Sequence, residues 1–153
     1  MNVFIGLLIT AGLCIVGMAH SAHALSSDAK TQLQSAKEIY VATQRKSGEW
    51  STAAPIWFMY ADDVVYFTVG PTSYKAKRIK SGRNAVRIWV GSKDGPMFSG
   101  KAEIFTDSTM VERMGEAYKK KYWLAWFGFA RPRVGRVESG KTVAIKVIPD
   151  AAE

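Results

Sequence analysis

Six short strand-like runs, three of them with clear alternation, constrain what this chain can fold into. Val86, Ile88 and Val90 would share one face of a strand, while Arg87 and Trp89 share the other. Glycine, proline and aspartate mark the turns. The runs span residues 38–45, 50–60, 64–68, 85–91, 97–106 and 142–148. Six strands with short turns favour a mainly β fold, a small closed β-barrel with flanking helices, because closure removes exposed strand edges.

Three further segments have helical spacing. Each is preceded by a serine or aspartate, the residue types that cap helix N-termini. The expected helices run from Ser26 or Ser27 to Lys37, over 74–80 behind Ser73, and over 108–126 behind Asp107 or Ser108. Residues 131–140 are expected to form a polar, basic connection to the last strand.

The composition bounds the chemistry of the chain. Its 153 residues, 48% of them hydrophobic, suit one domain with a buried core. The formal net charge is +8, and the first charged side chain is Asp28. A basic body suits an anionic ligand, a nucleic acid or an anionic membrane. For most of the cations, however, a solvated surface is the better explanation.

The N-terminus is typical of an export signal. Residues 3–19 are uncharged and mostly apolar, and 22–24 (Ala-His-Ala) has the form of a signal-peptidase site. We therefore expect a signal peptide at 1–24, a domain at 25–153, and export to the periplasm or the medium. No Lys or Arg precedes the apolar run, so an uncleaved anchor at residues 3–19 is the alternative, and a misplaced start codon is a third.

Cysteine and histidine are confined to this N-terminal region, at Cys14, His20 and His23. Cleavage after Ala24 would leave a chain without either residue type. That excludes disulfides, cysteine nucleophiles, Ser-His-Asp triads, and zinc or haem sites that rely on these ligands. We expect no metal site. If the protein is an enzyme, a bound cofactor would carry the difficult chemistry.

The most informative local feature is a strand that stops at a Gly-Pro loop and is followed by a basic helix. Thr68 ends the strand, Ser73 stands at the expected N-cap, and Lys75 follows just inside the helix. Two hydroxyls and a cation of this kind can converge on one phosphate group. Lys77 and Arg78 come next, but a single turn cannot aim every cation inward, so we expect these two to face solvent.

This element resembles the phosphate-binding element of the pyridoxamine-phosphate-oxidase-like flavoproteins, with Thr68, Ser73 and Lys75 at the matching positions. Other pieces follow in the order of that family, and the resemblance covers residues 39–149. Residues 41–45 with Ser47-Gly48 resemble its first hairpin, 55–58 the strand along the flavin ring, and 100–104 a later barrel strand.

The resemblance implies a six-stranded split β-barrel that pairs into a homodimer, with FMN or a deazaflavin coenzyme bound at the subunit interface. Thr68, Ser73 and Lys75 would hold the phosphate. The ring would lie on the segment Pro55, Ile56, Trp57 and Phe58. Barrel core is as good an explanation of Trp57 and Phe58, and alternation lets only one of them point inward.

The chain also departs from pyridoxamine-phosphate oxidases themselves. The arginine and lysine that those enzymes place on this strand match Ala53 and Phe58 here. The C-terminal segment that completes their pyridoxal pocket is missing from this sequence. We therefore expect no oxidation of vitamin B6, and a closer similarity to the shorter flavin- and deazaflavin-dependent reductases.

Residues 119–129 combine three lysines with a dense aromatic run. Tyr118, Tyr122 and Trp126 are spaced by four, so a helix would place them on one face. Core or homodimer packing is the favoured explanation. A lid over the flavin that admits an apolar, quinone-like substrate and a membrane-surface contact are the alternatives. Nucleic-acid binding is not expected, because the aromatic residues are not interleaved with the basic ones.

Two functions follow. The first is an FMN- or deazaflavin-dependent oxidoreductase that transfers hydride to a small organic acceptor. The second is a non-catalytic split-barrel protein that binds a flavin or another anionic ligand. The sequence identifies no catalytic acid or base that would separate them.

Overall fold

A computed structural model describes residues 24–151. The expectations for residues 1–23, which include the apolar run, Cys14, His20 and His23, lie outside the described part of the chain. Among the described residues, no helix is long and apolar enough to cross a membrane.

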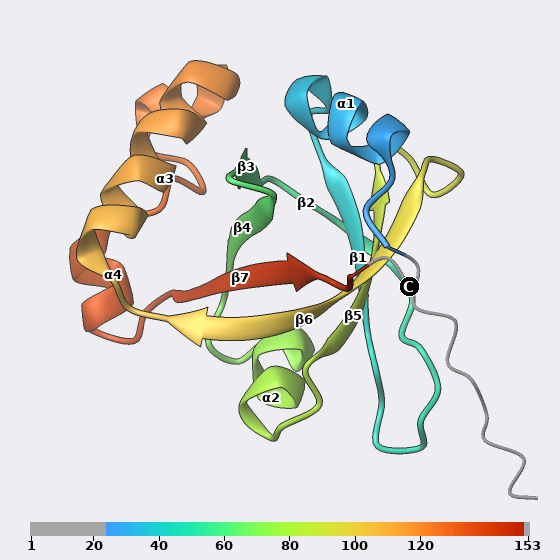
Figure 1. Cartoon of the computed structure of the whole chain (residues 1–153). Helices are drawn as coiled ribbons and strands as arrows, with labels where there is room; N and C mark the ends of the chain where they lie inside the picture. The colour runs from blue at the N-terminus through green and yellow to red at the C-terminus, as the bar shows by residue number, and fades with distance from the viewer. Residues whose placement is uncertain (1–23, 152–153) are drawn as a thin grey trace, which may run out of the picture.

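In this described part, seven antiparallel strands form a single curled sheet, with helices around it (Figure 1). Neighbouring strands in the sheet follow the order β2-β1-β5-β6-β7-β4-β3. The strands are β1 (Ile39–Thr43), β2 (Ala54–Ile56), β3 (Met59–Ala61), β4 (Val64–Val69), β5 (Ala85–Val90), β6 (Met97–Phe105) and β7 (Val143–Pro149). The sheet is a half-barrel, which is consistent with a split barrel.

The expected count of six strands is wrong, because the run 50–60 forms two strands and not one. β2 pairs with β1, whereas β3 pairs with β4 at the opposite edge of the sheet. Two residues, Trp57 and Phe58, join β2 to β3. This crossover therefore brings the two edges of the sheet together, and the sheet curls because the chain passes directly from one edge to the other.

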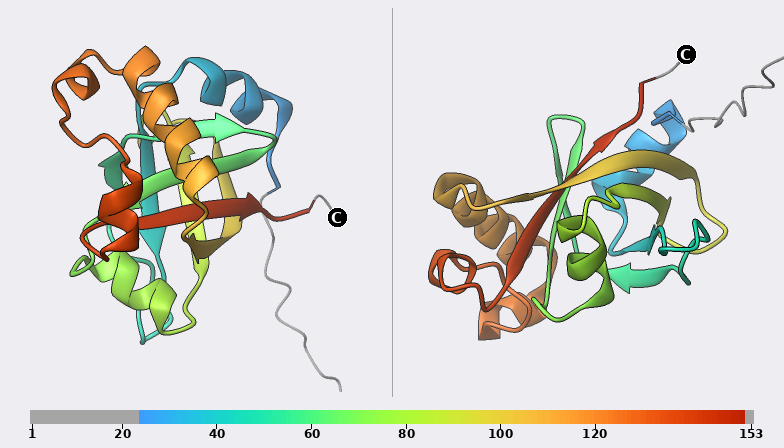
Figure 2. Two further views of the ribbon diagram at one scale, coloured as in Figure 1. Left: turned by 90° about the vertical axis from the view of Figure 1, so that its left-hand side faces the viewer. Right: turned by 90° about the horizontal axis from the view of Figure 1, so that it is seen from below.

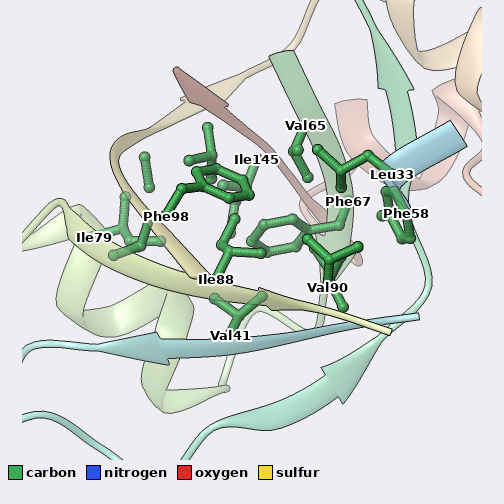
Figure 3. Packing of buried hydrophobic residues seen from close by; sticks show 14 of the residues in the cluster. Leu33, Val41, Phe58, Val65, Phe67, Ile79, Ile88, Val90, Phe98 and Ile145 are labelled. Atoms are coloured by element: carbon green, nitrogen blue, oxygen red, sulfur yellow. The ribbon is translucent and has the colours of Figure 1, made fainter. Parts of the chain in front are cut away.

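The other five strands are confirmed to within a few residues, and so is the alternation in β5. Val86, Ile88 and Val90 are at most 1% exposed, while Arg87 and Trp89 are half-buried. Inside the curl, Phe58, Phe67 and Phe98 pack with the aliphatic side chains of the strands (Figure 3). Burying one such side chain stabilises the fold by about 1.5–3 kcal/mol, so this cluster is the main source of stability.

Two short helices lie at opposite ends of the curled sheet (Figure 2). α1 (Ser27–Ser35) begins behind Ser26, whose Oγ accepts from the Ala29 N–H at 3.1 Å, and it ends two residues before the expected Lys37. α2 (Tyr74–Lys80) has the expected bounds and the expected Ser73 cap. Both helices bury small or aliphatic residues against the core, Ala29 and Leu33 from α1 and Ala76 and Ile79 from α2.

The C-terminal helices differ more from expectation. α3 (Ser108–Lys121) begins behind Asp107 as expected but ends five residues before Trp126. Tyr122 has extended backbone dihedral angles, and a 3₁₀ helix, η1 (Trp123–Phe127), follows it. The connection at 131–140 contains a short helix, α4 (Val134–Glu138).

Candidate functional site

A cavity of about 580 Å³ lies between β2 and the start of α2. We call it the α2 pocket. Its walls include Pro55 and Ile56 from β2, Gly70 from the loop after β4, and Ser73 and Lys75 from the start of α2. Two of the three predicted phosphate-binding residues therefore lie in one pocket.

Ser73 is both the helix cap and a wall of this pocket. Its Oγ accepts a hydrogen bond from the Ala76 N–H at 3.2 Å. The hydroxyl hydrogen is not used by that bond and can be donated to a ligand. The structural and the functional explanations of Ser73 are thus compatible.

Lys75 is half-buried and forms no ion pair with any described carboxylate. Burial lowers the pKa of its ammonium, and the neighbouring positive charge of Arg78 lowers it further. An anion in the α2 pocket would relieve both effects, because an opposite charge favours the protonated lysine.

Two arginines that sequence reasoning did not assign also line the α2 pocket, Arg45 and Arg78. Arg78 was expected to face solvent, which is wrong: it is half-buried, and its Nη1 donates to the buried Thr43 Oγ1 at 2.9 Å. That bond holds the guanidinium between β1 and α2. Lys77 is exposed as expected. Arg45 belongs to the hairpin that carries the family resemblance, and this was the feature of the sequence that could have identified it as a pocket residue.

Thr68 lines a second pocket that adjoins the α2 pocket, and we call this row of adjoining pockets the groove. This central pocket, of about 300 Å³, is lined by Pro55, Ile56, Trp57, Thr68, Tyr118 and Ala130. It shares Pro55 and Ile56 with the α2 pocket, so the two adjoin along β2. The structure therefore brings Ser73 and Lys75 together but does not place Thr68 in the same cavity.

The side chains of Trp57 and Phe58 point in different directions. Phe58 is fully buried in the barrel core and lines neither pocket. Trp57 is half-buried and stacks on Tyr122, with ring centroids 4.3 Å apart and planes 2° apart. Of the two, Trp57 is the one that can contact a ligand through its side chain.

Tyrosines at the end of α3 form hydrogen bonds with the backbone polar groups of this crossover. Tyr118 donates its hydroxyl to the Trp57 carbonyl at 2.6 Å. The Tyr122 hydroxyl accepts from the Phe58 N–H at 3.0 Å and donates to the Phe58 carbonyl at 3.2 Å. Burial raises the pKa of Tyr118 well above its usual value and that of Tyr122 to about 12. Both hydroxyls therefore stay protonated, and the backbone groups of the crossover are hydrogen-bonded to tyrosines at the end of α3.

In the described residues, no three His, Cys, Asp or Glu side chains cluster closely enough to hold a metal ion.

No protein-family model matches the sequence, and no curated protein matches it. Solved structures do match. A protein titled F420 reductase is 25% identical, with a TM-score of 0.56 over 80% of this chain and 93% of that chain. A putative pyridoxamine 5′-phosphate oxidase from Listeria innocua is 17% identical, with a TM-score of 0.58 over 80% and 90%.

These structures show that the chain has the split-barrel fold of the pyridoxamine 5′-phosphate oxidase-like proteins. A heme storage protein from Vibrio cholerae has the same fold, with 14% identity and a TM-score of 0.59 over 84% of this chain and 92% of that chain. Proteins named for different functions thus share this fold. The fold alone does not select among them, and the function has to be argued from the groove.

Proposed function

We propose that this split-barrel protein binds FMN or a deazaflavin coenzyme in the groove along β2 and transfers hydride between the coenzyme ring and a small organic acceptor. The observation that carries the proposal is the α2 pocket. Arg45, Ser73, Lys75 and Arg78 meet there at one end of a groove whose next section is walled by Pro55, Ile56 and Trp57. A phosphate-bearing flat ring matches this sequence of charged and apolar walls.

The donor set in the α2 pocket fits a phosphate group. The guanidinium groups offer planar pairs of N–H donors, Lys75 offers a compact cation, and Ser73 offers a hydroxyl. Ser51 and Thr52 add two more hydroxyls to the same wall. None of the described residues that line this pocket is acidic, although Arg45 also pairs with the exposed Glu49 at 3.8 Å.

A bound flavin or deazaflavin would supply the hydride chemistry. The chain's own part is to bind and orient the ring and to exclude water from its apolar face. The stack of Trp57 on Tyr122 provides a flat, rigid wall for that purpose. Tyr118 and Tyr122 fix the crossover under this wall, so the wall cannot shift without breaking their hydrogen bonds to the backbone.

Non-catalytic binding is the second candidate, and one observation favours it. Tyr118 is the one titratable side chain among the residues that line the central pocket. Its hydroxyl is committed to the Trp57 carbonyl and its pKa is raised, so it is a poor proton donor to a substrate. If the protein is an enzyme, hydride transfer must proceed without an acid or base from this wall.

The absorbance spectrum of the purified protein is the first test of the proposal. Fluorescence titrations of the cofactor-free protein with FMN and with the deazaflavin coenzyme are the second. Saturable binding of either is the expected result. A protein that binds neither coenzyme contradicts both candidates that involve a flavin. An assay of reduced coenzyme with small acceptors then separates the two candidates. Turnover identifies an enzyme, and no turnover identifies a binding protein.

Lys75→Ala should weaken coenzyme affinity by roughly 10- to 150-fold, because a charge-assisted hydrogen bond contributes about 1.5–3 kcal/mol. Lys80→Ala is the matched control, since Lys80 lies on the same helix but is exposed and lines neither pocket. Circular dichroism confirms that both variants fold. Equal affinity in the two variants would remove Lys75 from the site.

A further inference from the structure

A third cavity, of about 310 Å³, continues the groove beyond the central pocket. The two cavities share Thr68 and Ala130, so they adjoin at the end of β4. Three arginines line the third cavity, and we call it the arginine pocket. Its walls are Thr68, Gly128, Phe129, Ala130, Arg131, Arg133, Arg136 and Thr142. The apolar section of the groove therefore has a basic pocket at each end.

The three arginines carry little compensating charge. None of them forms an ion pair with a carboxylate in residues 24–151. Arg136 donates through Nε to Thr142 Oγ1 at 3.2 Å, and the buried Nε of Arg131 has no hydrogen-bond partner among the described residues. Two carboxylates, Glu112 and Glu116, line a neighbouring cavity together with Arg131 and Arg133. The pKa of Glu116 is lowered mainly by its hydrogen bond to Lys119 and only in part by the charge of Arg131.

The chain builds this pocket with backbone conformations that side chains rarely adopt. Gly128 has φ +84° and Ala130 has φ +50°, so the loop after η1 turns back sharply. A side chain at Gly128 would overlap the Arg133 guanidinium, so the glycine makes room for that group. α4 then presents Arg136 beside Arg133. A left-handed alanine costs free energy, and such strain is concentrated at functional sites.

We propose that the arginine pocket binds the anionic group, a carboxylate or a phosphate, of the molecule that reacts with the coenzyme. The role of that molecule as a reactant rests on the proposed function. The anion site itself is inferred from the geometry of the pocket alone. Guanidinium groups recognise both anions through paired N–H donors. The coenzyme phosphate and the substrate anion would then occupy opposite ends of one groove, with the reacting parts in the central pocket.

The proposal narrows the substrate class. An acceptor anchored at the arginine pocket is a small organic acid or a phosphate ester. An uncharged quinone would leave the arginines without a partner. Phe129 contributes an apolar wall beside the arginines, which suits an acid with an attached apolar body.

Titration followed by NMR tests the site directly, with inorganic phosphate and acetate as probes at low ionic strength. The amide signals of Gly128 and Ala130 report on the arginine pocket, and those of Gly70 and Ser73 report on the α2 pocket. We expect saturable shifts of the first pair with at least one of the two probes. The probe that binds more tightly identifies the anion as a carboxylate or a phosphate.

The variant that tests the assignment is Arg133→Gln with Arg136→Gln. Lys80→Gln with Lys101→Gln is the control, because it removes the same charge from two exposed positions outside the pocket. The arginine variant should weaken the Gly128 response roughly tenfold or more, since two charge-assisted contacts are lost, and the lysine variant should leave it nearly unchanged. Equal weakening in both, or no saturation in the wild-type protein, overturns the proposal.

Lys75→Ala separates this inference from the proposed function. It should abolish the phosphate response at Ser73 and keep the response at Gly128. If FMN and deazaflavin fail to bind while the Gly128 response remains saturable, the proposed function fails and the anion site stands. If a coenzyme binds and the Gly128 response is absent, the proposed function stands and the anion site fails.

Discussion

Lys121 is a cation held against the barrel core. Its Nζ lies 3.4 Å from the centroid of the Phe58 ring and 3.4 Å from the Phe58 carbonyl oxygen. Burial lowers its pKa to about 8, and the nearby charge of Lys37 acts in the same direction. The contacts with Phe58 favour the charged form, but the loss of hydration outweighs them.

This lysine makes stability depend on pH. Its folded pKa of about 8 is below the ordinary value of 10.5, so the unfolded chain binds more protons between these values. The free energy of unfolding should therefore rise as the pH increases from about 8 towards 9.5. Above about pH 10 the trend reverses, because the folded pKa values of Tyr60 and Tyr122, each about 12, exceed the usual 10.

Lys121→Met should remove most of the rise between about pH 8 and 9.5. Urea unfolding at the two pH values measures it. Lys120→Met serves as the control, because Lys120 is exposed. A variant whose pH dependence equals that of the wild-type protein would show that Lys121 is not the titrating group.

At the scale of single residues, the sequence predicted caps better than pocket walls. Ser73 and Asp107 were identified because a hydroxyl or carboxylate before a helix satisfies its free N–H groups, which is a local property. The place of Arg78 in a wall depends on how α2 sits on β1, because its direction is fixed by Thr43, 35 residues away in sequence. No local pattern carries that information.

At the scale of elements, α3 acts as a clamp on the crossover. Tyr118 and Tyr122 reach residues 61 and 64 positions earlier in the sequence and satisfy the polar groups of Trp57 and Phe58. These groups cannot pair in the sheet, because the chain there passes from one sheet edge to the other. The clamp therefore satisfies the backbone where the chain passes from β2 to β3 without a β2–β3 pairing.

Tyr122→Phe should destabilise the fold by about 1–3 kcal/mol, because it leaves the buried Phe58 N–H and C=O without this partner. Chemical denaturation gives the value. Tyr74→Phe is the comparison, since Tyr74 is 74% exposed and should change stability little. A loss below about 0.5 kcal/mol for Tyr122→Phe would show that the clamp is not a stabilising element.

The same clamp explains why two elements were mispredicted. The run 50–60 is apolar without a break from Ala53 to Tyr60, as a single strand can be, and nothing local shows that it changes edges at Trp57. The helical spacing of Tyr118, Tyr122 and Trp126 predicted one continuous face. Tyr122 instead adopts an extended backbone that turns its ring to Trp57, and Trp126 is left 72% exposed. In both places a long-range contact overrides the local period.

At the scale of the whole molecule, a cluster of aromatic side chains remains uncovered. Trp123, Trp126, Phe127 and Phe129 are 65–73% exposed. They lie on η1 and in the loop that leads to the arginine pocket. Tyr122, for which core or homodimer packing was expected, is buried within the single chain. An exposed apolar patch of this kind is typical of an interaction site.

We expect a second copy of the chain to cover this aromatic patch in a homodimer. Large aromatic side chains bury 150–250 Å² each and dominate interface energetics. Phe129 lines the arginine pocket, so a dimer that covers the patch would also close the groove from outside. Assembly and ligand binding should then depend on one surface.

Trp126→Asp should therefore lower dimerisation and coenzyme affinity together, because it places a charge at the centre of the patch. Light scattering at micromolar concentration gives the mass, and a titration with FMN gives the affinity. Gln34→Asp adds the same charge at an exposed position on α1 and should change neither. A stable monomer of the wild-type protein with a coenzyme bound would contradict the dimer. A Trp126→Asp dimer with full affinity would assign the patch to another partner.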